Sequence, residues 1–272
     1  MTPADFATMW PDAEQRIRDH ADRLLKTVVV ALFANPKRPR LVGSGFFVAY
    51  KSGLYLVSAR HVFAEQELLA DGDSLFYYSS RDTINGISGR LLTSPGPLRK
   101  DVVDIGILQV GKSHPAWSGD ARRTPVTFDA FDDLSSSDGE ELFLLAGYPE
   151  TKSRIDPQSG TMLAKPYGLT RRSTHHEKYV ALGLDPSTHI VVDFDQRKEQ
   201  RFVGRPNAQF PKPQGMSGAP LWMLKFTESG DIETRIVGLG IEHRSDDKAI
   251  VCVRAEPIMG LIQYMDAGPA TA

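Results

Sequence analysis

The chain has 272 residues, of which 41% are apolar, and its 32 basic and 34 acidic side chains give a formal charge of −2. This length and apolar content allow a sizeable core, which excludes a disordered or fibrous protein. The near balance of charge gives no reason to expect nucleic acid as a partner. No apolar run approaches the roughly 20 residues of a membrane-spanning helix, so we expect no membrane partner either.

The opening sequence and the single cysteine bear on where the protein works. The opening sequence MTPADFATMW lacks the basic stretch and apolar core of a secretory signal. A lone Cys252 excludes an intramolecular disulfide, and it alternates with Val251 and Val253 as a buried strand thiol does. We therefore expect a cytoplasmic protein in which Cys252 has no chemical role.

The first expected element is a helix. In residues 1–26 apolar side chains recur at helical spacing with charged residues between them, which predicts an N-terminal helical extension. From residue 27 the pattern changes to short β-rich runs separated by Gly, Pro, Asn, Asp and Ser, as in an all-β barrel or sandwich. We expect strands at 27–34, 41–50, 54–58, 74–79, 86–92 and 105–110.

A second series of strands follows a stretch that carries Pro115, Pro125 and a run of serines. We interpret residues 113–137 as a linker between two halves of the fold. Beyond Pro257, apolar residues at helical spacing predict a closing helix over 257–266. The strands expected in this second half are 142–147, 179–182, 190–195, 220–225, 232–241 and 249–254.

Three separated segments carry the residue types of nucleophilic catalysis. A serine hydroxyl needs a base to take its proton and a third group to orient that base. LVSARHVF places His61 in a turn directly after a predicted strand, DIGIL begins an apolar strand with Asp104, and GMSGAPLW places Ser217 in a loop between glycines. The glycines suit a tight turn in which the N–H groups of Gly215 and Ser217 would meet a substrate oxyanion.

In this order the three segments resemble the histidine, aspartate and serine signatures of the trypsin-like serine protease superfamily. GSGFFV at 43–48 resembles the strand before the histidine loop in its bacterial, HtrA-like members, and AGYP at 146–149 resembles a turn early in the second barrel. The resemblance covers most of the chain from about residue 27 to 265.

The resemblance implies an all-β, chymotrypsin-like fold of two antiparallel β-barrels with a helix at each end of the chain. The protease domain would span residues 27–272, with the first barrel at 27–112 and the second at 138–256. HtrA-type relatives carry a PDZ domain after the protease, but we expect none because the residues after Ser217 are needed to finish the second barrel.

The resemblance also implies a serine endopeptidase whose substrate is a protein or peptide. Ser217 would attack the peptide carbonyl, His61 would accept and return the proton, and Asp104 would orient the imidazole. The oxyanion hole would consist of the N–H groups of Gly215 and Ser217. No cofactor and no metal ion are required.

The same resemblance implies a pocket for the side chain before the scissile bond. Pro211 at its floor offers no charge, so a small or medium apolar side chain is the expected guest. Glu242 on the wall could instead bind a basic side chain. The expected substrate-binding residues are Pro211, Gly240, Ile241, Glu242 and His243.

Alternatives to an active peptidase stay open. The chain could be a catalytically silent peptide-binding module, or a protease held inactive until a regulatory partner protein remodels its loops; the segment 151–178 could be such a loop or a variable insertion. An esterase of the α/β-hydrolase type disagrees with the glycine pattern around Ser217. His175, His176 and Glu177 do not form HExxH, and we expect a polar loop there.

Overall fold

The protein is described by a computed structural model that covers residues 3–34, 39–67, 75–78, 84–95, 103–112, 114, 123–132, 134, 142–156, 162–172, 174–196, 210–227 and 231–268. Much of the predicted linker at 113–137, and residues 74 and 79 of one predicted strand, lie outside these ranges. The described residues form four α-helices: α1 (Pro3–Thr27), α2 (Arg60–Glu67), α3 (His176–Leu182) and α4 (Ala255–Ala267).

The first half of the chain forms a seven-stranded antiparallel sheet with the strand order β5-β4-β1-β2-β3-β7-β6. Strand β2 pairs with β1 on one side and with β3 on the other, and a two-residue turn at 51–52 connects β2 to β3. The strands are β1 (Val29–Ala34), β2 (Arg40–Tyr50), β3 (Gly53–Ala59), β4 (Phe76–Tyr78), β5 (Ile84–Gly86), β6 (Gly89–Thr93) and β7 (Ile105–Val110).

The second half forms a six-stranded antiparallel sheet with the order β11-β8-β13-β14-β15-β12. Its edge strands β11 and β12 approach each other, which curls the sheet. A separate hairpin pairs β9 (Ser153–Ile155) with β10 (Met162–Ala164). The sheet strands are β8 (Leu142–Gly147), β11 (Tyr167–Arg172), β12 (His189–Asp193), β13 (Pro220–Phe226), β14 (Ile232–Arg244) and β15 (Ala249–Arg254).

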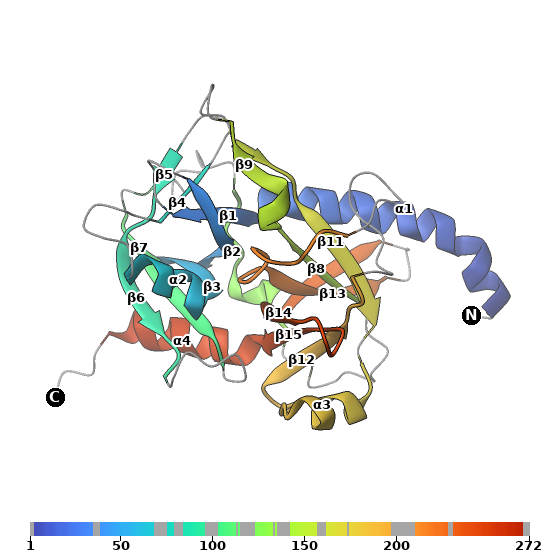
Figure 1. Ribbon diagram of the computed structural model, residues 1–272. Helices are drawn as coiled ribbons and strands as arrows, with labels where there is room; N and C mark the ends of the chain where they lie inside the picture. Colours follow the sequence, from blue (N-terminus) through green and yellow to red (C-terminus); the bar gives the residue numbers. More distant parts are fainter. Residues whose placement is uncertain are drawn as a thin grey trace.

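Two helices join the two sheets into one core. Helix α1 contacts β1 of the first sheet and β8 and β14 of the second, and α4 contacts β3 and β7 as well as β14 and β15. Figure 1 shows these helices on different sides of the sheets. Their buried faces, with Ile17 and Leu25 on α1 and Ile258 and Ile262 on α4, belong to one apolar cluster that contains strand residues of both sheets. The prediction of a mostly β protein with a helix before and after the strands is confirmed.

The strand predicted at 179–182 is wrong, because these residues belong to helix α3. Tyr179 is buried and its hydroxyl accepts a hydrogen bond from Val191 N–H at 2.9 Å, whereas the next residue, Val180, is 69% exposed. Gly183 ends the helix in the left-handed conformation with φ of 66°. A short run with Tyr, Val and Leu is ambiguous between strand and helix, and here the glycine cap favours the helix.

Cys252 lies in β15 and is fully buried, as predicted for a strand thiol. It belongs to a second apolar cluster made only of residues from the second half of the chain. Burial raises the pKa of its thiol, which keeps the sulfur protonated and unreactive. Over the part of the chain that the structure describes, no helix is both long enough and apolar enough to cross a membrane.

We expect the free energy of unfolding to fall as the pH drops below about 6.5, the ordinary pKa of histidine. Burial lowers the pKa of His114, whose ring packs against Phe47 and Tyr77. The unfolded chain therefore binds this proton at a higher pH than the folded chain does, and stability present at neutral pH is lost in acid, by at most about 1.4 kcal/mol per pH unit for one histidine. Urea unfolding at pH 7.5 and 5.5 measures the loss.

His114→Phe is the variant that isolates this effect, because it keeps a ring beside Phe47 and Tyr77 and removes the titrating group. The stability loss between the two pH values should be smaller in this variant than in the unsubstituted protein. An identical loss in both proteins would show that His114 does not contribute to it.

Candidate active site

The pairing of β3 with β7 brings His61 and Asp104 together. The antiparallel register places Ala59 opposite Ile105 and Ser58 opposite Gly106. His61 follows the end of β3 and Asp104 precedes the start of β7, so the two side chains meet at the same end of the strand pair. The sequence predicted each residue at a strand end, and the register explains why they are neighbours.

The sequence predicted a turn at His61 directly after a strand, and in the structure the residue lies in the first turn of helix α2. The helix can begin directly after β3 because Gly106 on the neighbouring strand leaves room for it. A Cβ atom at Gly106 would lie 2.3 Å from the ring of Phe63 and 3.3 Å from Cα of Arg60. The buried side chains Val62 and Phe63 fix α2 on the sheet, and this fixes the direction in which His61 leaves the helix.

The Asp104 carboxylate contacts His61 with both of its oxygens. Oδ2 lies 2.5 Å from the ring atom Nδ1, and Oδ1 accepts a hydrogen bond from the His61 backbone N–H at 3.1 Å. The Asp104 carbonyl in addition accepts a hydrogen bond from the Arg60 N–H at 3.2 Å. An ionised carboxylate can only accept, so Nδ1 carries the proton and Nε2 is left as the nitrogen that can take up another.

Ser217 lies in a tight loop just before β13. The loop is closed by hydrogen bonds from Met216 N–H to Pro213 O and from Ala219 N–H to Met216 O, both at 2.9 Å. Gly218 N–H donates to Gly240 O at 2.8 Å, which fixes the loop to β14. The loop also contacts the first sheet, because Ser217 O accepts a hydrogen bond from Ser44 N–H of β2 at 2.8 Å.

His61, Asp104 and Ser217 line one open cleft of about 510 Å³. The Ser217 hydroxyl donates to the carbonyl of Ile241 at 3.4 Å, and within the described residues it makes no hydrogen bond to His61. A hydroxyl has one proton to donate, so Ser217 must leave the Ile241 carbonyl before it can donate to His61. Such contacts between catalytic groups often form only when a substrate is bound.

The N–H groups of Gly215 and Ser217 have no carbonyl partner among the described residues. In a trans peptide unit the N–H points opposite to the C=O. The Gln214 carbonyl accepts from Glu150 N–H, so the Gly215 N–H of the same peptide unit points away from Glu150. The Met216 carbonyl accepts from Ala219 N–H, so the Ser217 N–H points away from Ala219. Gly215 adopts a φ of +89°, a conformation that favours glycine.

A small cavity of about 20 Å³ adjoins Ser217, and its lining is mostly apolar. Four predicted substrate-binding residues lie in this region: Gly240 lines the small cavity, and Ile241, Glu242 and His243 line both the cavity and the cleft. Pro211 is buried and lines neither, whereas Pro213 lines both. The apolar part of the cavity lining is made by Leu145, Pro213, Met216, Ile241 and Ile250.

The charged residue on the cavity wall is already paired. Arg244 Nε donates to Glu242 Oε2 at 3.0 Å, and Arg244 Nη1 donates to the carbonyl of Leu182 at 3.0 Å. Both side chains of the pair are largely buried. The ring of His243 packs edge to face on Phe194, and burial lowers its pKa while the nearby Glu242 carboxylate raises it to a lesser extent. The carboxylate of Glu242 is therefore occupied within the protein.

The polar loop predicted at 175–177 is wrong for His176 and Glu177, which begin helix α3, with His175 as the residue that precedes it. His175, His176 and Glu177 are exposed at the start of α3. Among the residues with described positions, no three His, Cys, Asp or Glu side chains gather where a metal ion could bind.

Sequence reasoning did not single out Ser44 or Pro213 as parts of the site. Ser44 is a fully buried polar residue between two glycines of an otherwise apolar strand, and that pattern was the available signal. Pro213 gave no signal, because its place in the cavity depends on the path of the loop before Ser217.

A comparison of the sequence with models of known protein families gave no match, and a comparison with curated proteins gave none either. The interpretation of the site therefore depends on its geometry.

Proposed function

We propose that this protein is a serine endopeptidase with a chymotrypsin-like arrangement of two β-barrels, acting through Ser217, His61 and Asp104. The observation that carries the proposal is the contact between Asp104 and Nδ1 of His61 in the same cleft that Ser217 lines. The two curled antiparallel sheets support the fold assignment. The protein or peptide substrate and a cytoplasmic location belong to the same proposal.

The chemistry would be acyl transfer to water. Ser217 Oγ attacks the peptide carbonyl carbon and gives its proton to Nε2 of His61, while Asp104 stabilises the resulting imidazolium. The carbonyl oxygen gains negative charge and is met by the N–H groups of Gly215 and Ser217. His61 then protonates the leaving amine, and water releases the acyl group from Ser217 in a second round.

Reaction with a fluorophosphonate probe tests the proposal, because the probe modifies a serine only when its hydroxyl is activated. We expect labelling of Ser217, located by mass spectrometry of the digested protein. Labelling should disappear in Ser217→Ala and persist in Ser187→Ala, which changes an exposed serine in the turn before β12. A folded protein that is not labelled at Ser217 would reject the proposal.

A second candidate is a protease that is silent until a regulatory partner protein binds. The observation in its favour is the hydrogen bond from the Ser217 hydroxyl to the Ile241 carbonyl, which withholds the proton from His61. A catalytically silent peptide-binding module is the limiting case of this candidate. Slow labelling of the purified protein that accelerates in a cell extract would favour the partner-activated form.

We expect cleavage after small apolar residues. The cavity beside Ser217 has a volume of about 20 Å³, which is room for a group little larger than a water molecule. A basic side chain would find no free partner because Glu242 is paired with Arg244, and burial of an unpaired cation costs several kcal/mol. Alanine before the scissile bond should therefore be preferred over arginine by at least about 10²-fold in kcat/KM.

Cleavage of a random peptide library followed by mass spectrometry measures this preference. A dominant arginine or lysine before the cut would contradict the expectation and would show that Glu242 leaves Arg244 when substrate binds. The variant Glu242→Gln tests whether Glu242 binds basic side chains. If it does, the variant should reduce cleavage after arginine and lysine and leave cleavage after apolar residues unchanged.

A further inference from the structure

The two peptide units that flank Gly215 have their carbonyl oxygens, those of Gln214 and Gly215, held by groups from outside the loop at 213–219, called the serine loop below. The Gln214 carbonyl accepts a hydrogen bond from the Glu150 N–H at 2.7 Å, and the Gly215 carbonyl accepts one from Ser44 Oγ at 2.9 Å. Ser44 belongs to β2 of the first sheet, and Glu150 begins the 3-10 helix η3 (Glu150–Lys152) shortly after β8. The peptide units on both sides of Gly215 thus have their orientation fixed by distant parts of the chain.

Ser44 directs every one of its polar atoms to the serine loop or its immediate surroundings. Its N–H donates to Ser217 O at 2.8 Å, and its hydroxyl accepts a hydrogen bond from the Tyr148 N–H at 3.0 Å. Its carbonyl accepts from Ser58 Oγ at 2.7 Å. The residue is fully buried, so a partner that lost one of these bonds would be left unpaired away from water.

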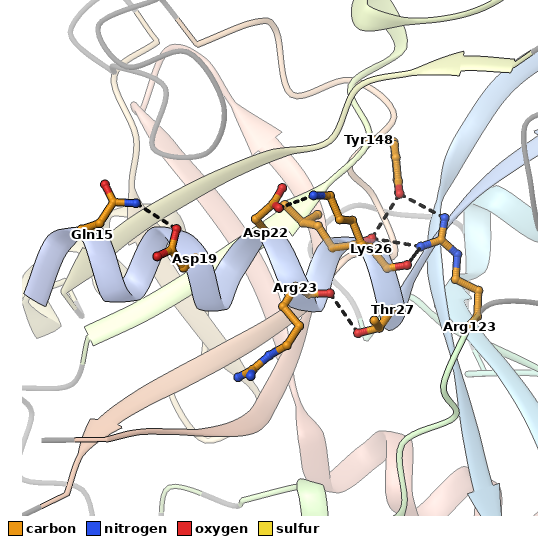
Figure 2. A network of polar contacts seen from close by, with 9 residues as sticks. Gln15, Asp19, Asp22, Arg23, Lys26, Thr27, Arg123 and Tyr148 are labelled. Carbon is orange, nitrogen blue, oxygen red and sulfur yellow. Dashed lines mark hydrogen bonds and ion pairs between the residues drawn. The ribbon is translucent and has the colours of Figure 1, made fainter. Parts of the chain in front are cut away.

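Tyr148 begins the turn at 148–150, which leads into η3, and connects this turn to helix α1 (Figure 2). Its hydroxyl donates to the Leu25 carbonyl at 3.2 Å and accepts from Arg123 at 3.3 Å, and Arg123 also donates to the Leu25 carbonyl at 3.1 Å. These donors pair with carbonyl oxygens that a helix leaves without partners at its C-terminal end. The turn at 148–150 is therefore fixed to α1 on one side and holds Gln214 on the other.

Gly215 needs such external support because glycine has the most freely rotating backbone of all residues. If the Gln214–Gly215 peptide turned over, the Gln214 carbonyl would take the place of the Gly215 N–H, and a negatively charged oxygen would meet an acceptor. The hydrogen bond from Glu150 N–H opposes this rotation directly, since it would break. The bond from Ser44 Oγ holds the adjoining Gly215–Met216 peptide unit, which limits the backbone rotation at Gly215 that a turned-over peptide would need.

We propose that Ser44 and the turn at 148–150 are positioning groups of the oxyanion hole, which hold the Gly215 N–H in the direction of the acyl oxygen. This inference rests on the proposed function, because an oxyanion hole has a use only if Ser217 attacks a carbonyl. None of these groups touches the substrate, and each acts through the backbone of Gly215.

Two variants remove one support each. Ser44→Ala removes the hydroxyl that donates to the Gly215 carbonyl. Glu150→Pro removes the N–H that donates to the Gln214 carbonyl at an exposed position, and its geometry suits proline: it is the first residue of a helical turn, and Pro149 before it already has an extended backbone with φ −67° and ψ 136°. Glu150→Ala is the matched control, because it loses the same side chain and keeps the N–H.

Hydrogen exchange measures the segment without any need for activity. The Met216 N–H donates to Pro213 O within the loop, so its exchange rate reports how firmly the loop is held. We expect this amide to exchange at least about 10-fold faster in Ser44→Ala and in Glu150→Pro than in Glu150→Ala, while the amides of the β13–β14 ladder keep their rates. An unchanged Met216 rate in both variants overturns the inference.

The kinetics of fluorophosphonate labelling measure the oxyanion hole itself. The rate constant of the chemical step should fall by up to about 10²-fold in both variants, while the concentration for half-maximal rate stays the same, because positioning acts on the transition state. Faster Met216 exchange with an unchanged labelling rate also overturns the inference. If the unsubstituted protein is not labelled at all, the proposed function fails, and the exchange rates still decide whether Ser44 and Glu150 hold the segment.

Discussion

Ser217→Ala and His61→Ala should each lower the rate of peptide cleavage by about 10⁶-fold, the size of loss seen when a catalytic serine or its base is removed. The free energy of unfolding should change little, because both side chains border an open cleft and His61 is 41% exposed. Initial rates on a peptide substrate and urea unfolding of the same preparations give the two quantities.

The double variant is the internal control for this expectation. Nucleophile and base act as a unit, so the double variant should be scarcely slower than either single variant. Losses that multiply would mean that the two residues act independently, and a Ser217→Ala protein with the original rate would refute the proposed function.

Gly218→Ala should destabilise the protein by about 3–5 kcal/mol, through backbone strain and overpacking together. Gly218 adopts φ of +87°, and a Cβ atom there would lie 2.0 Å from Ser44 O and 2.2 Å from Ser58 Oγ. Ser44 O is a backbone atom, and the Ser58 hydroxyl is buried and held by its hydrogen bond to that same oxygen, so neither can move away without a loss. Denaturant unfolding measures the change.

Gly183→Ala provides a comparison at a second glycine with positive φ. Gly183 has φ of +66° at the end of α3, but a Cβ atom there would meet nothing within 4 Å. Only the conformational term applies, so the expected loss is about 1 kcal/mol. Equal losses at the two positions would show that crowding of the added Cβ atom against the first sheet does not contribute to the loss at Gly218.

Patterning predicted the β-rich composition, the two terminal helices and the strand ends at which His61 and Asp104 lie. These features depend on local spacing of apolar residues and on motifs that lie within a few residues of each other. The strands β9, β10 and β11 were not predicted, because they lie in the polar segment 151–178, where apolar periodicity is weak. Their formation depends on pairing with partners such as β8, which local sequence does not reveal.

The contacts that organise the serine loop could not be predicted for the same reason. Ser44 and Gly215 are 171 positions apart in the sequence, and their hydrogen bond exists only because the two sheets pack together. Likewise, the pairing of Glu242 with Arg244 depends on side-chain direction at an irregular point of β14, where the register with β15 shifts. Spacing alone left Glu242 open as a binder of basic side chains.

The division of the site between the two sheets has a consequence for the order of events during synthesis. His61 and Asp104 can meet as soon as β3 and β7 have left the ribosome, because both strands belong to the first half of the chain. Ser217 can join them only after the loop before β13 and the strand β14 that holds it have been made, and these lie in the second half of the chain. If the proposed function is right, a growing chain carries the proposed base long before the proposed nucleophile.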